Sequence, residues 1–236
     1  MQRFHFPTLN NKELLIISND NDIYHQLTKV LRINTGEEVI FFDGSNLYDY
    51  IYKVDFIEKK SIGFKLIKKL PKQSENNLEI NLYQSIPNKQ EKIEYIIQKG
   101  VEVGYSSFIF FKSERSQNLK INENKIDRFK KIITEAVEQS GRNITPEIQF
   151  LEKIDLKSTK GQNIYFHTDN NKAKKLKELN IKEGKINIFI GPEGGFSENE
   201  IDVFDKNGFQ KVNLGDFILR TETAGIVVGF YLLENL

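Results

Sequence analysis

The sequence predicts an α/β protein in which a small β-domain precedes a larger domain built around a parallel sheet. Polar and apolar residues alternate with period two from Tyr48 to Phe56, as expected of a half-buried antiparallel strand. Pro, Gln, Ser and Asn crowd the stretch from Pro71 to Asn77, a composition typical of a linker. From Leu78 onward, apolar strand-like runs alternate with helical patterns, which predicts a parallel sheet covered by helices.

The first domain is expected to span residues 1–72 and to form a small β-barrel. Asp43-Gly44 lies before the Tyr48–Phe56 strand, and a second alternating stretch, Ile62–Leu66, follows it, so neighbouring strands joined by tight turns are expected. One short helix is expected near Ile23–Leu31.

The second domain is expected to span residues 73–236. Its five strand-like runs are Ile80–Ile86, Phe108–Phe111, Ile164–His167, Ile186–Ile190 and Val212–Leu214. Two helices between them are amphipathic with a period of 3.6 residues, so that one face of each is expected in the core. These faces carry Ile93, Ile96, Ile97 and Val101 in one helix and Ile126, Phe129, Ile133, Ala136 and Val137 in the other.

Composition narrows the classes of function. The chain has 236 residues and no Cys, and its three histidines, His5, His25 and His167, lack metal-ligand spacing, so no structural metal is expected. The apolar run Ile226–Leu233 is far shorter than the roughly 18 residues that span a bilayer, and a cytoplasmic protein is expected. A net charge of +1 gives no global signal for nucleic acid, so any RNA contact must depend on local patches.

A glycine-rich segment, Gly191–Phe196, follows the predicted strand Ile186–Ile190, and we call it the glycine loop. Glycines permit close backbone approach, and ligands of open α/β sheets bind at the carboxyl ends of strands, although a tight turn that needs glycine for geometry alone remains an alternative. The spacing matches neither the Walker nor the Rossmann fingerprint. Ser197 with Glu200 predicts a capping box for the next helix, and Gly208 predicts its end.

A second segment, Leu214–Ala224, again reads as strand, loop and helix. Thr221 or Thr223 is expected to cap the last helix, and Arg220 in the loop is expected to pair with Glu222. This helix is apolar on most of its circumference, so that one face can enter the core of its own domain while the rest needs another partner. The sequence therefore predicts a homodimer.

Three motifs together carry a resemblance that covers essentially the whole chain. They are Ile190-Gly191-Pro192-Glu193-Gly194-Gly195, Leu219-Arg220-Thr221-Glu222-Thr223-Ala224 and Glu138-Gln139-Ser140-Gly141-Arg142, with Phe41-Asp43-Gly44 near the amino terminus. The chain resembles the RsmE family of 16S ribosomal RNA uracil-N3 methyltransferases, which belongs to the SPOUT superfamily. The resemblance implies a PUA-like, RNA-binding β-barrel followed by a SPOUT methyltransferase domain with a deep trefoil knot, which pattern reading alone does not predict.

The resemblance also implies the ligands and the site. S-adenosyl-L-methionine is the expected cofactor, the small ribosomal subunit and its 16S RNA the expected partner, and N3 of one uridine, position 1498 in the standard numbering of that RNA, the expected target. Cofactor contacts are expected from His167, Ile190, Gly191, Pro192, Glu193, Gly194, Gly195, Leu214, Gly215, Ile218, Leu219, Thr223 and Ala224. RNA contacts are expected from Arg3, His5, Lys29, Arg32 and Arg115.

Chemistry assigns the catalytic candidates. Uracil N3 carries a proton and becomes a good nucleophile only when that proton leaves, so the site must stabilise negative charge on the ring. Arg220, with Arg142, is expected to do this, and Glu222 is expected to orient Arg220. Because N3 lies on the Watson–Crick edge, the base must be unpaired or flipped out. Two alternatives stay open: a non-catalytic ribosome-assembly or RNA-binding factor, and a SPOUT enzyme that acts on another RNA base.

Overall fold

The computed structural model describes residues 1–9, 12–72, 78–156, 159–168, 173–181 and 184–235. The chain folds into two compact units. The first consists of Met1–Glu75 together with Val137–Thr145, and the second of Asn76–Ala136 together with Pro146–Leu236. Nothing in the sequence pattern predicts that the internal segment Val137–Thr145 belongs to the first unit. Most of the predicted linker, residues 73–77, lies outside the described residues.

The first unit contains a five-stranded sheet in the order β1-β3-β4-β5-β2. Its strands are β1 (Arg3–His5), β2 (Leu14–Ser18), β3 (Glu38–Phe42), β4 (Tyr48–Ile57) and β5 (Ser61–Pro71). All neighbours are antiparallel except β1 and β3, which run parallel. The predicted helix is also present, as α1 (Asp22–His25) continued by a π-helical turn, η1 (Gln26–Val30).

Strand β4 departs from the simple alternation that its sequence suggests. Tyr50, Tyr52 and Val54 are buried in the core, as the period of two predicts. Tyr48 at the start of the strand is instead exposed, and its neighbour Asp49 is buried. A carboxylate is buried at low cost only when it is paired and hydrogen-bonded, so Asp49 must have partners that the sequence pattern does not reveal.

The second unit contains a seven-stranded parallel sheet in the order β10-β12-β9-β11-β6-β7-β8. Its strands are β6 (Leu78–Ser85), β7 (Ser107–Phe111), β8 (Glu147–Leu151), β9 (Gln162–Phe166), β10 (Lys174–Lys175), β11 (Gly184–Ile190) and β12 (Gln210–Asn213). Five of these strands are those that the sequence predicts. The other two, β8 and β10, are the edge strands, which carry too little buried apolar surface to stand out in the sequence.

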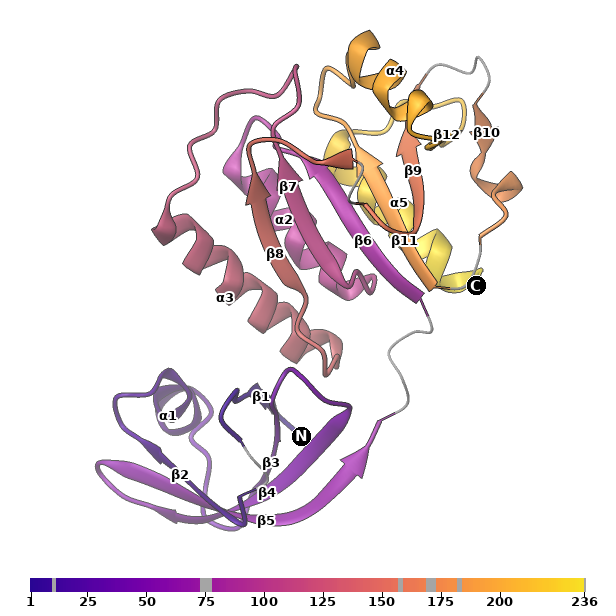
Figure 1. The fold of residues 1–236 in the computed structure, drawn as a ribbon. Helices are drawn as coiled ribbons and strands as arrows, with labels where there is room; N and C mark the ends of the chain where they lie inside the picture. The colour runs from indigo at the N-terminus through magenta and orange to yellow at the C-terminus, as the bar shows by residue number, and fades with distance from the viewer. Residues whose placement is uncertain (10–11, 73–77, 157–158, 169–172, 182–183, 236) are drawn as a thin grey trace. The chain divides into compact units, whose positions relative to one another are not determined.

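Helices cover both faces of this sheet (Figure 1). They are α2 (Gln90–Glu102), α3 (Glu123–Ser140), α4 (Glu198–Lys206) and α5 (Thr221–Glu234), with a short 3-10 helix, η3 (Leu176–Glu178). Helices α2 and α5 lie side by side on one face, where the Tyr105 hydroxyl, beyond the end of α2, donates to the backbone oxygen of Gly225. On the other face, Phe204 of α4 packs against Phe189 of β11 and Tyr165 of β9.

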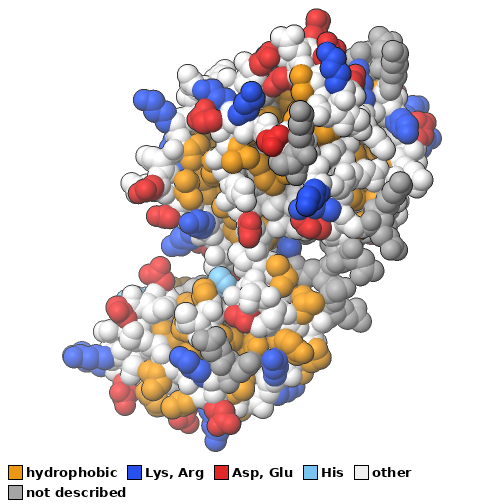
Figure 2. All heavy atoms as spheres, viewed as in Figure 1, with side chains coloured by type: hydrophobic (Ala, Val, Ile, Leu, Met, Phe, Trp, Pro, Cys, Tyr) orange, Lys and Arg blue, Asp and Glu red, His pale blue; other side chains and the backbone are white. Residues whose placement is uncertain are grey.

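Two surface properties bear on function. In the part of the chain that the structure describes, no helix is both long and apolar enough to cross a membrane. On the face drawn in Figure 2, acidic and basic side chains are interspersed with apolar ones. This mixture agrees with the near-neutral net charge of the sequence.

Candidate functional site

Three loops meet at one edge of the parallel sheet. Strands β12, β9 and β11 are consecutive neighbours and run parallel, so their carboxyl ends lie at the same edge. The loops that leave these ends begin at His167, at Gly191 and at Leu214. They contain most of the residues that the sequence assigns to cofactor binding. The exceptions are Ile190, which ends β11, and Thr223 and Ala224, which lie in the first turn of α5. Residues 169–172 of the first loop lie outside the described residues.

The backbone of the glycine loop depends on two of its glycines. Gly195 has φ +68°, in the left-handed region that side chains disfavour, and its amide donates to the backbone oxygen of Pro192 at 2.9 Å. A Cβ atom on Gly191 would lie 3.2 Å from the backbone nitrogen of Phe196. The turn therefore needs glycine for its own geometry, and the approach of a ligand to the same backbone stays a prediction.

The helix after the glycine loop begins as the sequence predicts. The Ser197 hydroxyl accepts from the Glu200 amide at 3.1 Å, and the Glu200 carboxylate accepts from the Ser197 amide at 2.8 Å. Gly208, just past the end of α4, has φ +76°. The predicted capping box and left-handed C-terminal glycine are confirmed, so the loop is fixed at its exit by local interactions.

Arg115 holds the glycine loop from a neighbouring strand end. Its Nη1 atom donates to the backbone oxygens of Gly194 at 2.9 Å and of Phe196 at 3.3 Å. Its chain segment follows β7 and was predicted from sequence only as an RNA-binding segment. The observed contacts give this guanidinium a role in shaping the loop, although the side chain is also exposed to solvent.

Asn213, which the sequence analysis missed, joins the other two loops. Its amide nitrogen donates to the backbone oxygens of His167 at 3.3 Å and Thr168 at 3.1 Å, and its side-chain oxygen accepts from the Gly215 amide at 2.6 Å. A buried Asn at the end of a strand could have signalled this, because such an amide must satisfy its hydrogen bonds locally.

A buried chain of hydrogen bonds joins the glycine loop to α5. The Thr221 hydroxyl donates to the backbone oxygen of Gly191 at 2.6 Å and accepts from the Gln84 amide at 2.8 Å. The prediction that Thr221 or Thr223 caps α5 is wrong, because Arg220 is the N-cap residue and makes no side-chain cap bond. The Thr221 hydroxyl instead joins the glycine loop to Gln84 of β6 by hydrogen bonds. Gln84 is fully buried, and the sequence pattern does not predict its role.

Charged groups from both motifs converge on Lys92 of α2. The Lys92 ammonium lies 2.6 Å from Glu193 in the glycine loop and 3.6 Å from Glu222 in α5. Burial is the largest single influence on the pKa of Glu193 and would raise it, but the hydrogen bond from Lys92, the backbone hydrogen bonds and the charge of Lys92 together lower that pKa below its usual value. The same hydrogen bond raises the pKa of Lys92. The partner of Glu222 in the structure is Lys92, whereas Arg220 was expected.

Arg220 itself lies beside exposed apolar residues. It ends the loop after β12 and is exposed, while its neighbour Leu219 is half-buried. Phe217 and Ile218 in the same loop are 88% and 82% exposed. The expected cofactor contact Ile218 therefore faces solvent in the chain as described, and Leu214 and Leu219, both half-buried, are the apolar walls that this loop offers.

The third motif, Glu138–Arg142, lies in the first unit. Arg3 donates to the backbone oxygen of Arg142 at 3.2 Å, to the side chain of Asn143 at 2.9 Å and to Asp49 at 2.9 Å. The Arg3 side chain is only 12% exposed, and its guanidinium also lies 4.7 Å from the centre of the Phe42 ring. The expectation that Arg3 contacts RNA phosphates does not fit this geometry, because both terminal nitrogens of its guanidinium donate to groups inside the unit.

The same correction applies to His5. Its Nε2 atom lies 3.1 Å from the backbone oxygen of Asp43, and its backbone amide donates to Glu138 at 2.8 Å. Burial lowers the pKa of this imidazole below its usual value, so it is a poor carrier of positive charge. Lys29 and Arg32, in contrast, are exposed, so their side chains remain available to contact phosphates. The backbone of Arg32 is in the left-handed region, with φ +52°.

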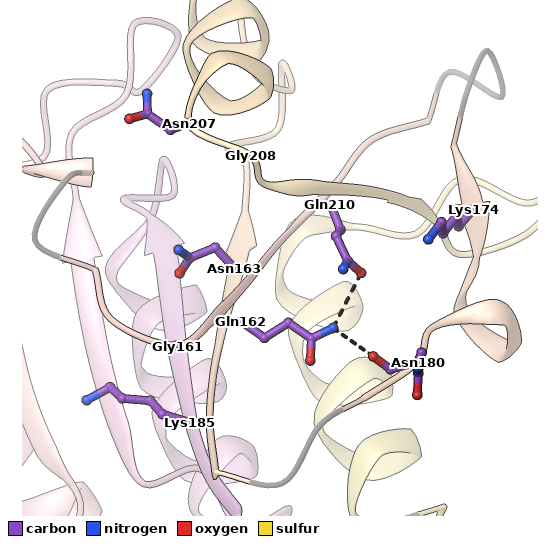
Figure 3. A pocket seen from close by; sticks show the side chains of 9 residues that line it. All are labelled: Gly161, Gln162, Asn163, Lys174, Asn180, Lys185, Asn207, Gly208 and Gln210. Atoms are coloured by element: carbon purple, nitrogen blue, oxygen red, sulfur yellow. Dashed lines mark hydrogen bonds between the residues drawn. The ribbon is translucent and has the colours of Figure 1, made fainter.

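A hollow of about 680 Å³ lies at the opposite edge of the sheet (Figure 3). It is lined by residues at the amino ends of the same parallel strands, among them Gln162, Lys185 and Gln210. Gln162 bridges the backbone oxygen of Asn180 and the side chain of Gln210. The hollow shares no lining residue with the three loops, so it is not the predicted cofactor site. Among the described residues, no cluster of metal-binding side chains is present.

Comparison with known proteins identifies the class and then the family. Residues 74–232, which include all three loops, match the model of a family described as an RNA methyltransferase domain. The chain is 35% identical over 226 residues to the ribosomal RNA small subunit methyltransferase E of Buchnera aphidicola subsp. Acyrthosiphon pisum, covering 93% of this chain and 87% of that protein. It is 30% identical to the protein of the same name in Aquifex aeolicus, covering 91% and 92%.

A solved structure agrees with these sequence relatives. The ribosomal RNA small subunit methyltransferase E from Neisseria gonorrhoeae, bound to S-adenosyl methionine, superposes with a TM-score of 0.86 at 28% identity, covering 98% of this chain and 96% of that chain. The chain therefore belongs to the ribosomal RNA small subunit methyltransferase E family, which confirms the resemblance found in the motifs.

Proposed function

We propose that the chain transfers the methyl group of S-adenosylmethionine to N3 of one uridine in the 16S RNA of the small ribosomal subunit, in the cytoplasm. The observation that carries the proposal is the meeting of the glycine loop with the Arg220 segment, joined by the Thr221–Gly191 hydrogen bond, at the carboxyl edge of the sheet. Relatives named for this reaction on small-subunit RNA, and one relative solved with the cofactor, support it.

The residues present fit the cofactor. A Cβ on Gly191 would lie only 3.2 Å from the Phe196 backbone nitrogen and Gly195 has a left-handed backbone, so both positions favour glycine and the loop offers bare peptide groups to a flat purine. Leu214 and Leu219 supply apolar contacts, and Asn213 holds the loops on either side of them together. In the proposed site, these backbone and apolar groups bind the adenosine part without a metal ion. S-adenosylmethionine, when bound, supplies an electrophilic methyl group on a positively charged sulfur.

Arg220 is the proposed electrostatic catalyst. Loss of the N3 proton places negative charge on the two uracil carbonyl oxygens, and a guanidinium can donate to such oxygens with two parallel N–H groups. Arg220 is exposed at the end of the Leu214–Arg220 loop, where it can reach an incoming base. Arg142 and Arg115 remain candidates for contacts to RNA. Because Lys92 already pairs with Glu222, we propose that Glu222 acts on Arg220 through the position of α5 and makes no direct bond to it.

We also propose the finer features of the fold that the family resemblance implies. For a trefoil knot, support comes from the order of the sheet: β12 lies beyond β9, yet the next element, α5, packs against β11 and β6 beside α2. The Leu214–Arg220 segment therefore runs back from β12, past β9, to reach the start of α5. For a PUA-like barrel that binds RNA, support comes from the five mixed strands around one core in the first unit.

A homodimer is proposed because α5 has apolar side chains on an exposed face as well as on its buried face. Helix α5 buries Ala224, Val228 and Leu232 within its own unit. On its other side, Val227 and Phe230 remain exposed, Phe230 by 58%. Large apolar side chains on an exposed helix face favour association with a second copy across a two-fold axis. Light scattering at micromolar concentration should give twice the monomer mass, and a purely monomeric protein would contradict the proposal.

One assay identifies both the substrate and the product of the proposed reaction. Small ribosomal subunits that lack the modification are incubated with the protein and isotopically labelled S-adenosylmethionine, and the RNA is then digested and analysed by nucleoside mass spectrometry. We expect one label per subunit, on N3-methyluridine. Label on another base would favour a related enzyme of different target, and binding to subunits without any label would favour an assembly factor.

A further inference from the structure

Lys92 lies where the two signature motifs meet. It projects from the first turns of α2 and pairs with a carboxylate from each motif, Glu193 and Glu222. The backbone amide of Asn88, just before α2, donates to the same oxygen of Glu193 at 3.2 Å. The amino end of α2 thus contacts the glycine loop directly, through a side chain that neither motif contains.

A second linkage lies beneath this one and is independent of it. Gln84, which is fully buried, Thr221, which is largely buried, and the backbone oxygen of Gly191 form a chain of neutral hydrogen bonds between the same two segments. Because this buried chain fixes where the glycine loop and α5 begin, loss of Lys92 should not unfold the unit. The Lys92 bridge therefore acts on the parts of the two segments that lie outside this hydrogen-bonded chain, namely Glu193 and the first turn of α5.

Electrostatics gives the bridge its effect. Both carboxylates lie within 3.6 Å of one nitrogen atom, so they are close to each other and repel without the ammonium between them. The Glu222 side chain is only 13% exposed, and its Oε2 atom has no hydrogen-bond partner among the described residues. Without Lys92, this carboxylate would lack its compensating charge, and the two segments would move apart to reach water.

We propose that Lys92 is a positioning residue that couples the glycine loop to the turn carrying Arg220, so that cofactor binding and placement of the catalytic guanidinium depend on one ammonium group. The inference rests on the proposed function, since it assigns cofactor binding to one segment and catalysis to the other. It adds a residue outside both motifs to the working parts of the site, and it makes α2 the element that connects them.

The test compares Lys92→Met, which keeps the length of the side chain and removes its charge, with Lys92→Arg and with Lys99→Met. Lys99 lies on the same helix and, among the residues that the structure describes, forms an ion pair only with Glu102 in its own turn, at 2.7 Å, so its loss controls for a change of charge on α2. We expect Lys92→Met to raise the KM for S-adenosylmethionine and to lower kcat, each about tenfold, with Lys92→Arg close to wild type and Lys99→Met unchanged.

A double substitution separates coupling from simple damage. Lys92→Met combined with Glu193→Gln removes one of the two repelling carboxylates, and we expect it to recover part of the lost kcat relative to Lys92→Met alone. Losses that only add would contradict the proposal, as would wild-type KM and kcat in Lys92→Met.

A measurement without substrate keeps the inference distinct from the proposed function. In the protein alone, Lys92→Met should speed amide hydrogen exchange in the glycine loop and in the first turn of α5, but not in α4. If wild-type protein methylated no RNA and exchange still rose at both segments, the proposed function would fail and the coupling would stand. Unchanged exchange at both segments would overturn the coupling itself.

Discussion

The segment Val137–Thr145 in the first unit is held by a buried charge, whereas the glycine loop in the second is joined to α5 by neutral hydrogen bonds with a charged bridge at the rim. Asp49 binds Arg3 and accepts from Asn143 inside the first unit. In the second unit, Gln84 and Thr221 occupy the buried position and Lys92 the outer one. Both arrangements fix a motif-bearing segment to a sheet.

The difference between them predicts different responses to substitution. A buried ion pair stabilises little in net terms, yet it is costly to break, because the remaining partner stays buried and uncompensated. The Lys92–Glu193 pair is more exposed than the Arg3–Asp49 pair and lies outside a neutral network, so its loss should cost the unit less stability. The first network should therefore control whether its unit folds, and the second should control how well a folded site works.

The largest effect is expected from Asp49→Ala. This substitution leaves Arg3, and the more exposed Lys72 at 3.7 Å, without their carboxylate. We expect the free energy of unfolding of the first unit to fall by about 3–5 kcal/mol, the range for removing one partner of a buried pair. Urea titration followed by tyrosine fluorescence measures it. Asp55→Ala, on the same strand but exposed, is the matched control and should cost far less.

Arg220→Ala should affect the reaction and leave the fold unchanged. Arg220 is exposed and caps no helix end with its side chain, so stability and cofactor affinity should change little. Methyl transfer should slow by roughly a hundredfold, the scale of one lost electrostatic contact. Single-turnover rates at saturating cofactor isolate this step.

Arg220→Lys is the informative companion, since it keeps the charge but loses the planar fork, and it should rescue poorly. A wild-type rate in Arg220→Ala would make Arg142 the better candidate.

Gly195→Val should weaken cofactor binding. A Cβ atom at this position would meet no heavy atom within 4 Å, so the main cost comes from holding a β-branched residue at φ +68°. Strain of this kind amounts to about 1–3 kcal/mol, and the loop can relieve it by leaving the binding geometry. Gly208→Val imposes the same strain at φ +76° after α4, away from the loop, and should leave affinity intact. Calorimetry with chelator present measures both.

The smallest effect is expected from the pH dependence of the Lys92–Glu193 pair. The pKa of Glu193 is lowered in the folded chain, so its contribution to stability is present above the usual value of about 4.5 and is lost as pH falls through the folded pKa. Wild type and Lys92→Met should therefore differ slightly in thermal midpoint at pH 7 and converge near pH 3. A difference that persisted at low pH would show that Lys92 stabilises through packing.

Local sequence patterns were enough to predict most of the elements. The five inner strands of the parallel sheet, the capping box at Ser197 and the left-handed glycine after α4 depend on neighbours in the chain, and the structure confirms them. The glycine loop and Arg220 could be selected as site residues because motif spacing is also local. Edge strands β8 and β10 were missed because they bury too little apolar surface to leave a pattern.

Tertiary structure decided which polar side chains are partners. Arg3 meets Asn143 across 140 positions of sequence, and Lys92 meets Glu193 across 101, and no periodicity encodes such distances. Arg3 and His5 therefore looked available to RNA although folding uses them internally, and Lys92, Gln84 and Asn213 looked like ordinary surface or core. The sequence by itself determined most of the elements, the family and the motif residues. Only folding decided which of their charges are compensated, because compensation depends on proximity in space.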